Sequence, residues 1–225
     1  MLKKFLNFVT DTGKNISEMI LFSGYTMLLF LESLFFLKSI FNRGGEIIRQ
    51  MFNAGVRTLL VVTVVGMFTG MILTVQTGVE MQDFHMEDLI GNVVIATMTR
   101  EMGPFVTAII LIASVGSSMA AELGTMKVSE EIDALEIMSI NPVRFLVMPR
   151  VVALSVMLPV ATVYTNVVGT LGGAIVAHSH LQMPYETFYL HVLQSLHFKA
   201  VYVGLFKSLT FSILVSSVSC AQGLL

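Results

Sequence analysis

The sequence has little charge, almost no cysteine and no tryptophan. Only 12% of its 225 residues are charged, and the formal net charge is −2. Average soluble domains carry about 25% charged residues. The near-neutral balance offers no basis for binding nucleic acid, and the single Cys220 excludes an internal disulfide framework. Because the chain has no tryptophan, any aromatic belt at a membrane interface must come from Phe and Tyr.

Catalytic and nucleotide-binding motifs are also missing. The chain contains no GxxxxGK[ST] phosphate loop, no HExxH and no GxSxG. Two histidines, His178 and His180, stand beside the end of an apolar run, but two ligands are too few to predict a metal site. We therefore expect no catalytic residues, no metal and no cofactor bound by this chain.

Long apolar runs dominate the sequence instead. Hydrophobic residues make up 55% of it, and the mean hydropathy is +0.81. A transmembrane helix needs about 20 apolar residues. The N-terminal apolar part is too short for a cleaved signal peptide, so none is predicted. Four segments qualify as spans: roughly Leu59 to Val79, a stretch within Leu89 to Ala121, Val143 to Ala177, and Ala200 to Cys220.

Basic residues in the connecting segments predict the orientation. Residues 1–57 carry seven Lys and Arg residues, whereas the loop from Glu80 to Leu89 carries none. The segment 119–142 and its exit carry Lys127, Arg144 and Arg150, and the loop 178–199 has a basic residue only at its end. Because Lys and Arg favour the cytoplasmic side, residues 1–57 and 119–142 should be cytoplasmic and 178–199 external.

A fifth apolar segment, Met19 to Leu37, has basic residues on both sides. If it crossed the membrane, one basic cluster would lie outside. We therefore predict an interfacial or re-entrant amphipathic helix, with an additional span as the alternative. The expected fold is an all-α integral membrane protein, one domain over residues 1–225, with this N-terminal interfacial helix, four spans and a cytoplasmic helix.

Small residues recur at a spacing of four along the predicted spans. Such spacing lets helix backbones approach closely in lipid. It predicts a tightly packed bundle or a dimer. The residues are Gly66 and Gly70, then Gly116, Ala120 and Gly124, then Gly169 and Gly173.

Three ionisable residues fall within or near the predicted spans: Arg100, Glu101 and Lys207. Such residues cost about 2.5–3.5 kcal/mol each on insertion scales and are functional candidates. Arg100 and Glu101 are adjacent and project about 100° apart on a helix, so Lys207 is the expected partner of Glu101. They predict a polar cavity between helices. Alternatively, Met102 to Ala121 alone forms the span and leaves the first two at the outer interface.

The segment "AAELGTMKVSEEIDALEIMSINPVRF" (Ala120 to Phe145) is polar and acidic between two apolar runs. Ser129 can cap a helix that Asn141 and Pro142 would end, which predicts a helix over Ser129 to Ile140. Such a helix would dock a soluble partner; a solvated connection is the alternative. Its apolar positions are Val128, Ile132, Leu135 and Met138, and its acidic positions are Glu130, Asp133 and, at the edge, Glu136.

Residues 100–153, from "REMGPF" through "AAELGTMKVSEE" and "INPVRF" to "MPRVVA", closely resemble the MlaE/YrbE-type permeases of ABC lipid transporters. A weaker resemblance covers nearly the whole chain. It implies a homodimer that binds an ABC ATPase subunit, which holds ATP and Mg, and an MCE-domain protein. Because the sequence shows no plastid-type transit peptide, a bacterial inner membrane is the expected location. It also implies that the cargo is a phospholipid, passed between the inner membrane and the MCE-domain protein to maintain the outer membrane.

The resemblance assigns residues to two sites. Coupling to the ATPase would involve Glu122, Gly124, Glu130, Asp133 and Glu136. The lipid cavity would involve Arg100, Glu101, Lys207, Leu73 and Gln76.

Two departures from the family pattern stand out. A position that is commonly acidic is Ala200 here, and the family's final span would follow Leu225, where this sequence ends. A truncated chain, or a final helix supplied differently, is therefore expected. The other functions that the residues allow are a proton-coupled secondary transporter using Glu101 and Lys207, and a structural membrane subunit.

Overall fold

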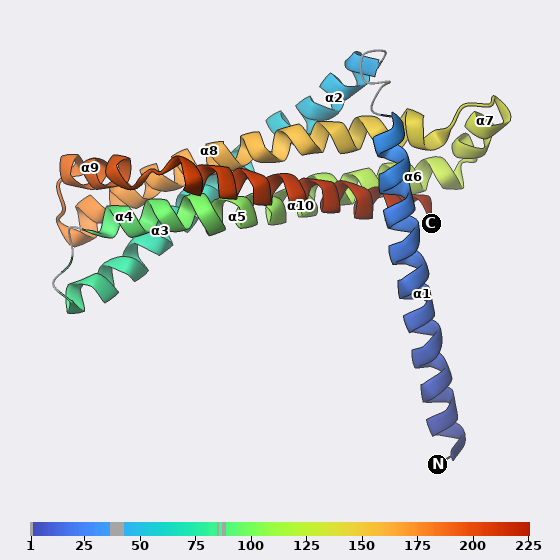
Figure 1. Cartoon of the computed structure of the whole chain (residues 1–225), viewed down its shortest axis with the longest axis horizontal. Coiled ribbons are helices and arrows are strands. Elements are labelled where there is room, and N and C mark those ends of the chain that lie inside the picture. Colours follow the sequence, from blue (N-terminus) through green and yellow to red (C-terminus); the bar gives the residue numbers. More distant parts are fainter. Residues whose placement is uncertain (1, 37–42, 85, 87–88) are drawn as a thin grey trace.

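The computed structural model describes residues 2–36, 43–84, 86 and 89–225, and it contains helices but no strand within those ranges (Figure 1). This confirms the predicted all-α class. Parts of two predictions lie outside the described residues: Leu37 and Lys38 at the end of the N-terminal segment, and His85 in the loop from Glu80 to Leu89.

Four long helical stretches form a bundle that runs the length of the molecule (Figure 1). Each is longer than its predicted span, because nothing in the flanking sequence breaks the helix. At about 1.5 Å per residue, stretches of 39 residues exceed a hydrocarbon core of about 30 Å. They therefore continue into the aqueous phase. The four stretches are Gly44–Gln82, Ile90–Val128, Val143–Leu181 and Phe198–Leu224.

Several of these stretches are divided by short changes of helix type. The first joins α2 (Gly44–Gly55) to α3 (Leu59–Asp83) through a 3₁₀ turn, so this helix begins well before the predicted Leu59. The remaining bundle helices are α4 (Ile90–Thr97), α5 (Gly103–Leu111) and α6 (Ser117–Val128), then α8 (Met148–Leu181) and α10 (Phe198–Leu224). The π-helical turns are Met98–Met102, Ile112–Gly116 and Val143–Val147.

The two ends of the bundle carry different elements. The short helix α7 (Glu131–Ile137) lies at one end, where the C-terminus also lies (Figure 1). The connection between α3 and α4 and the helix α9 (Tyr185–Ser195) lie at the other end. The segments predicted to be cytoplasmic and external are therefore separated in space, as the charge pattern requires.

Helix α1 (Leu2–Phe35) extends away from the bundle at the α7 end and lies across its long direction (Figure 1). By length and hydropathy alone, its part Thr12–Phe35 could also cross a membrane. The crosswise direction is the one that an interfacial helix would have, but the choice between an interfacial helix and an additional span stays a prediction. Near its C-terminal end, Leu29 and Ser33 are buried against the bundle.

Helix α9 was not predicted, because the segment 178–199 was interpreted as a loop. It folds back against α4, and Phe188 is fully buried in a cluster with Ile90 and Val94. Pro184 precedes its first turn in an extended conformation. The spacing of Phe188, Val192 and their apolar neighbours was the signal for this helix.

Small residues form the contacts between bundle helices within this one chain. A side-chain carbon built on Gly70 would collide with the backbone carbonyl of Gly169, and one on Gly66 would come within 3.1 Å of Thr165 Cγ2. Helices α3 and α8 can therefore approach closely only because these positions lack side chains. Likewise, a side-chain carbon on Gly223 of α10 would lie 2.7 Å from the carbonyl of Ala120 in α6.

Candidate functional site

Arg100 and Glu101 lie at an irregular turn of the second helical stretch. Pro104 has no amide hydrogen, so the carbonyl of Arg100, four residues earlier, cannot make its α-helical bond. The amide of Gly103 instead donates to the carbonyl of Met98, which is a π-helical step. Turns of this kind are frequent at functional sites. The turn leaves the carbonyl of Arg100 open to a partner from another helix.

Lys207 of α10 is that partner. Its ammonium donates to the Arg100 carbonyl at 3.2 Å and lies 2.5 Å from Glu101 Oε1. The close approach depends on Gly204, one turn earlier in α10, where a side-chain carbon would collide with the carbonyl of Thr99. The predicted pairing of Glu101 with Lys207 is confirmed, although the contact to the Arg100 carbonyl was not foreseen.

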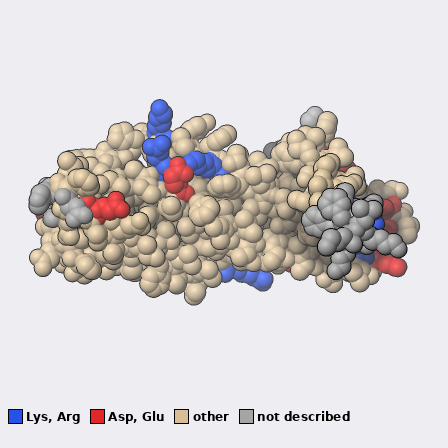
Figure 2. Space-filling view, turned by 90° about the horizontal axis from the view of Figure 1, so that it is seen from below, with Lys and Arg blue, Asp and Glu red and all other residues tan. Residues whose placement is uncertain are grey.

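The other residues predicted for the lipid cavity are not gathered at this ion pair. Glu101 and Lys207 line a pocket of about 440 Å³ with Phe105 and Phe211, whereas Arg100 lines a different pocket. Figure 2 shows how few charged side chains interrupt one long side of the bundle.

The pocket at Arg100 has a volume of about 330 Å³ and is also lined by His197 and Lys199. Leu73 packs against the cluster around Phe188, and Gln76 is exposed on α3. The grouping of these residues in one lipid cavity therefore stays a prediction.

A further pocket of about 400 Å³ lies between α4, α8, α9 and α10 and was missed by sequence reasoning. Its walls are mainly aliphatic, including Ile95, Val163 and Leu193. Two polar groups on the same walls, Asn166 Oδ1 and Thr99 Oγ1, are buried without hydrogen-bond partners. Because these two atoms are fully buried, the surface that the pocket presents is almost entirely apolar.

The polar segment after the second stretch contains a shorter helix than predicted, Glu131–Ile137 instead of Ser129 to Ile140. The predicted N-cap was wrong, because the Ser129 hydroxyl donates back to the Thr125 carbonyl at 2.9 Å and so belongs to the end of α6. The turn between α6 and α7 is made by Glu130, whose φ of 58° is left-handed. A non-glycine residue in that region is uncommon.

The two sides of α7 differ from the predicted division. Ile132 is buried and joins a cluster with Leu123 and Leu146, which attaches α7 to the ends of α6 and α8. By contrast, Val128 and Met138, which were predicted to share its apolar face, are exposed. The outward surface of the segment carries acidic and apolar side chains together: Val128, Glu130, Asp133, Glu136, Ile137 and Met138.

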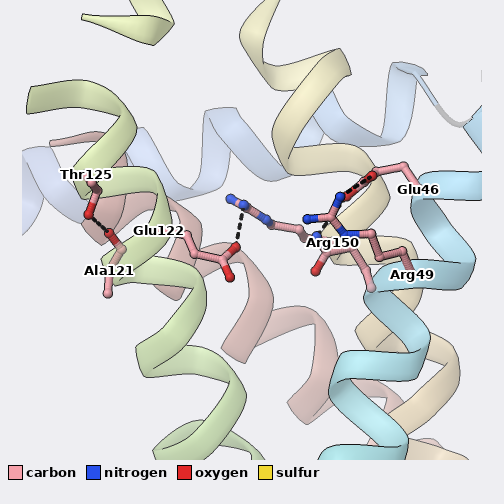
Figure 3. A network of polar contacts seen from close by, with 7 residues as sticks. Glu46, Arg49, Ala121, Glu122, Thr125 and Arg150 are labelled. Carbon is pink, nitrogen blue, oxygen red and sulfur yellow. Dashed lines mark hydrogen bonds and ion pairs between the residues drawn. The ribbon is translucent and has the colours of Figure 1, made fainter. Parts of the chain in front are cut away.

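The remaining residues predicted for coupling lie in α6 rather than on this outward surface. Gly124 faces Gly223 of α10, and a side-chain carbon built on Gly124 would lie 3.9 Å from the Gly223 carbonyl. Glu122 accepts a hydrogen bond from the guanidinium of Arg150 in α8 at 2.9 Å (Figure 3). Arg150, which sequence reasoning used for orientation and in the family pattern but not as a site residue, is 5% exposed. This ion pair connects the start of α8 to α6.

Comparison with known proteins gives a consistent result. A family model described as "Permease MlaE" matches residues 47–225. A probable ABC transporter permease protein of Synechocystis is 32% identical over 219 residues, which cover 96% of this chain and 83% of that protein. A probable ABC transporter permease protein of Rickettsia typhi is 35% identical over 177 residues, which cover 79% of this chain and 68% of that protein. The intermembrane phospholipid transport system permease protein MlaE of Haemophilus influenzae is 32% identical over 171 residues, which cover 76% of this chain and 66% of that protein.

Proposed function

Because this chain belongs to the MlaE permease family, we propose that it is the membrane-embedded subunit of a phospholipid transporter in a bacterial inner membrane, driven by a separate ABC ATPase. The name of the Haemophilus relative supports phospholipid as the cargo. The lack of a phosphate loop in the sequence supports a separate ATPase.

The observation that carries the proposal is the exposed surface of α7, held at one end of the bundle. Its buried Ile132 packs with Leu123 of α6 and Leu146 before α8. Movement of α7 by a docked partner would therefore be passed to the second and third stretches together. Packed helices of this kind move as nearly rigid bodies rather than deforming continuously.

The second part of the proposal concerns the lipid. Two copies of the chain would enclose a cavity that receives a phospholipid, and an MCE-domain protein would exchange it on the external side. The ion pair of Glu101 and Lys207 would meet the polar headgroup, since both side chains are partly exposed to a pocket. Closure of the ATPase dimer would shift the bundles and change the size of that cavity.

The docking surface gives a direct test. We expect the double variant Glu130→Lys and Asp133→Lys to lose co-purification with the ATPase subunit, because both exposed carboxylates face outward beside apolar side chains. Ile137→Arg, at a side chain that is 84% exposed, should have the same effect without reversing an acidic charge. Glu186→Lys on α9, at the opposite end, is the control and should retain the complex. Unchanged recovery of the ATPase with both α7 variants would contradict docking at this helix.

A proton-driven carrier is the rival function, and the ion pair of Lys207 with Glu101 is the feature that favours it. Reconstituted vesicles separate the two. ATP-dependent lipid transfer that persists after the proton gradient is collapsed supports the ABC permease. Transfer driven by a proton gradient, with no ATPase present, would support the carrier.

A further inference from the structure

A second polar pocket lies at the α7 end of the bundle, away from the intramembrane ion pair. It has a volume of about 500 Å³ and lies between α2, α6 and the start of α8. Three arginines line it, Arg43, Arg49 and Arg150, together with Glu46 and Glu122. Figure 3 shows that Glu46, Glu122 and Arg150 come from three different helices and meet in one region. Neither the coupling surface on α7 nor the lipid cavity uses this pocket.

The carboxylates in the pocket already have partners. Glu46 accepts a hydrogen bond from Gln50 Nε2 at 3.0 Å, and its other oxygen lies 3.9 Å from Arg49. Glu122 accepts from Arg150 at 2.9 Å. Three positive groups therefore face two carboxylates that are already engaged, and the pocket has an excess of donors.

Arg150 supplies a buried hydrogen-bond donor that has no acceptor, which indicates a site for an anion. The residue is 5% exposed, and its NH1 atom is buried with no hydrogen-bond partner. A buried charged donor without an acceptor costs free energy. Guanidinium groups bind phosphate oxygens through two parallel hydrogen bonds. A phosphate in the pocket would supply the acceptor that this arginine lacks.

Two features beside Arg150 favour an anion in the same place. The guanidinium of Arg43 stacks over the Phe145 ring at 3.8 Å, a contact that fixes its position and leaves its in-plane donors available. Arg43 directly precedes α2, a helix of 12 residues whose first turn has no side-chain cap. The free amides and the dipole of a helix N-terminus attract anions.

The surroundings identify the source of the phosphate. The pocket is at the end that the charge pattern assigns to the cytoplasm, and Phe145, Leu146 and Met126 add apolar walls. Ile48 and Phe52, four residues apart on α2, are 67% and 55% exposed and offer a surface for acyl chains. We propose that this pocket binds the phosphate of an anionic phospholipid from the cytoplasmic leaflet, as a site separate from the transported lipid.

The test uses the full chain, purified in a nonionic detergent and titrated with phosphatidylglycerol, with bound lipid counted by native mass spectrometry. The pocket variant is Arg43→Gln with Arg49→Gln. The matched control is Arg57→Gln with Arg144→Gln, which removes two positive charges from the same end but outside the pocket. We expect the pocket variant to bind phosphatidylglycerol at least about tenfold more weakly and the control to bind as the unaltered chain does.

Three results would overturn the proposal. Equal binding by the pocket variant and the unaltered chain would exclude the pocket. Equal losses in both double variants would show only a general attraction of the basic end for anionic lipid. Saturable binding of inorganic phosphate, together with no saturable binding of phosphatidylglycerol, would assign the pocket to free phosphate instead. A melting temperature preserved in each variant shows that the fold is intact.

Discussion

Replacing Gly70 by alanine tests the packing that holds the bundle together. The added carbon would collide with the Gly169 carbonyl and lie 2.7 Å from Gly169 Cα, where carbon atoms normally stay about 3.5–4.0 Å apart. The obstacle is helix backbone, so no side chain can rotate away and α3 must move from α8 by about 1 Å. Overpacking of this kind costs about 1–3 kcal/mol. For a chain of this size, the melting temperature should fall by roughly 2–12 °C.

The assay can use Cys220, which is the single cysteine and is fully buried. A maleimide dye that fluoresces on reaction labels it only as the bundle unfolds, so heating the purified chain with the dye reports the transition. The control is Gly124→Ala, whose added carbon has 3.9 Å to its nearest neighbour. It should keep or slightly raise the melting temperature, because alanine favours a helix by about 0.5–1 kcal/mol over glycine. If both variants melt like the unaltered chain, the close α3–α8 contact is refuted.

Two further predictions follow from the same contacts. Phe188→Ala should destabilise the protein by about 3–5 kcal/mol and lower the melting temperature read from Cys220, because the side chain is fully buried. Leu190→Ala, at a residue that is 58% exposed, should change that melting temperature little. Equal melting temperatures of the two variants would contradict the burial argument. Lys207→Met should lower ATP-driven lipid transfer by about tenfold or more, equivalent to about 1.4 kcal/mol, because Glu101 loses its partner in the membrane. Full transfer by a correctly assembled variant would remove this ion pair from the mechanism.

The local pattern of the sequence was sufficient for the main features of the fold. Hydropathy identified the four bundle helices, and positive charge correctly separated the segments that lie at the two ends of the bundle, because both properties depend on each segment's own contact with lipid or water. The pairing of Glu101 with Lys207 could also be predicted, because an unpaired charge in lipid requires a partner and the spans offered few. The acidic segment before Asn141 was also recognisable as an exposed element.

Only the tertiary structure decided which surfaces meet. Three contacts each join segments far apart in the chain: Gly70 with Gly169, Glu122 with Arg150, and Phe188 of α9 with Ile90 and Val94 of α4. No periodicity within one helix specifies the face of another. Ser129 shows the same limit locally: its hydroxyl could cap α7 or close α6, and the left-handed turn at Glu130 decided for α6. The sequence determined the long apolar helices and the charge pattern from which their orientation is predicted, because both depend on each segment's own composition, whereas packing determined α9 and the pockets between the helices.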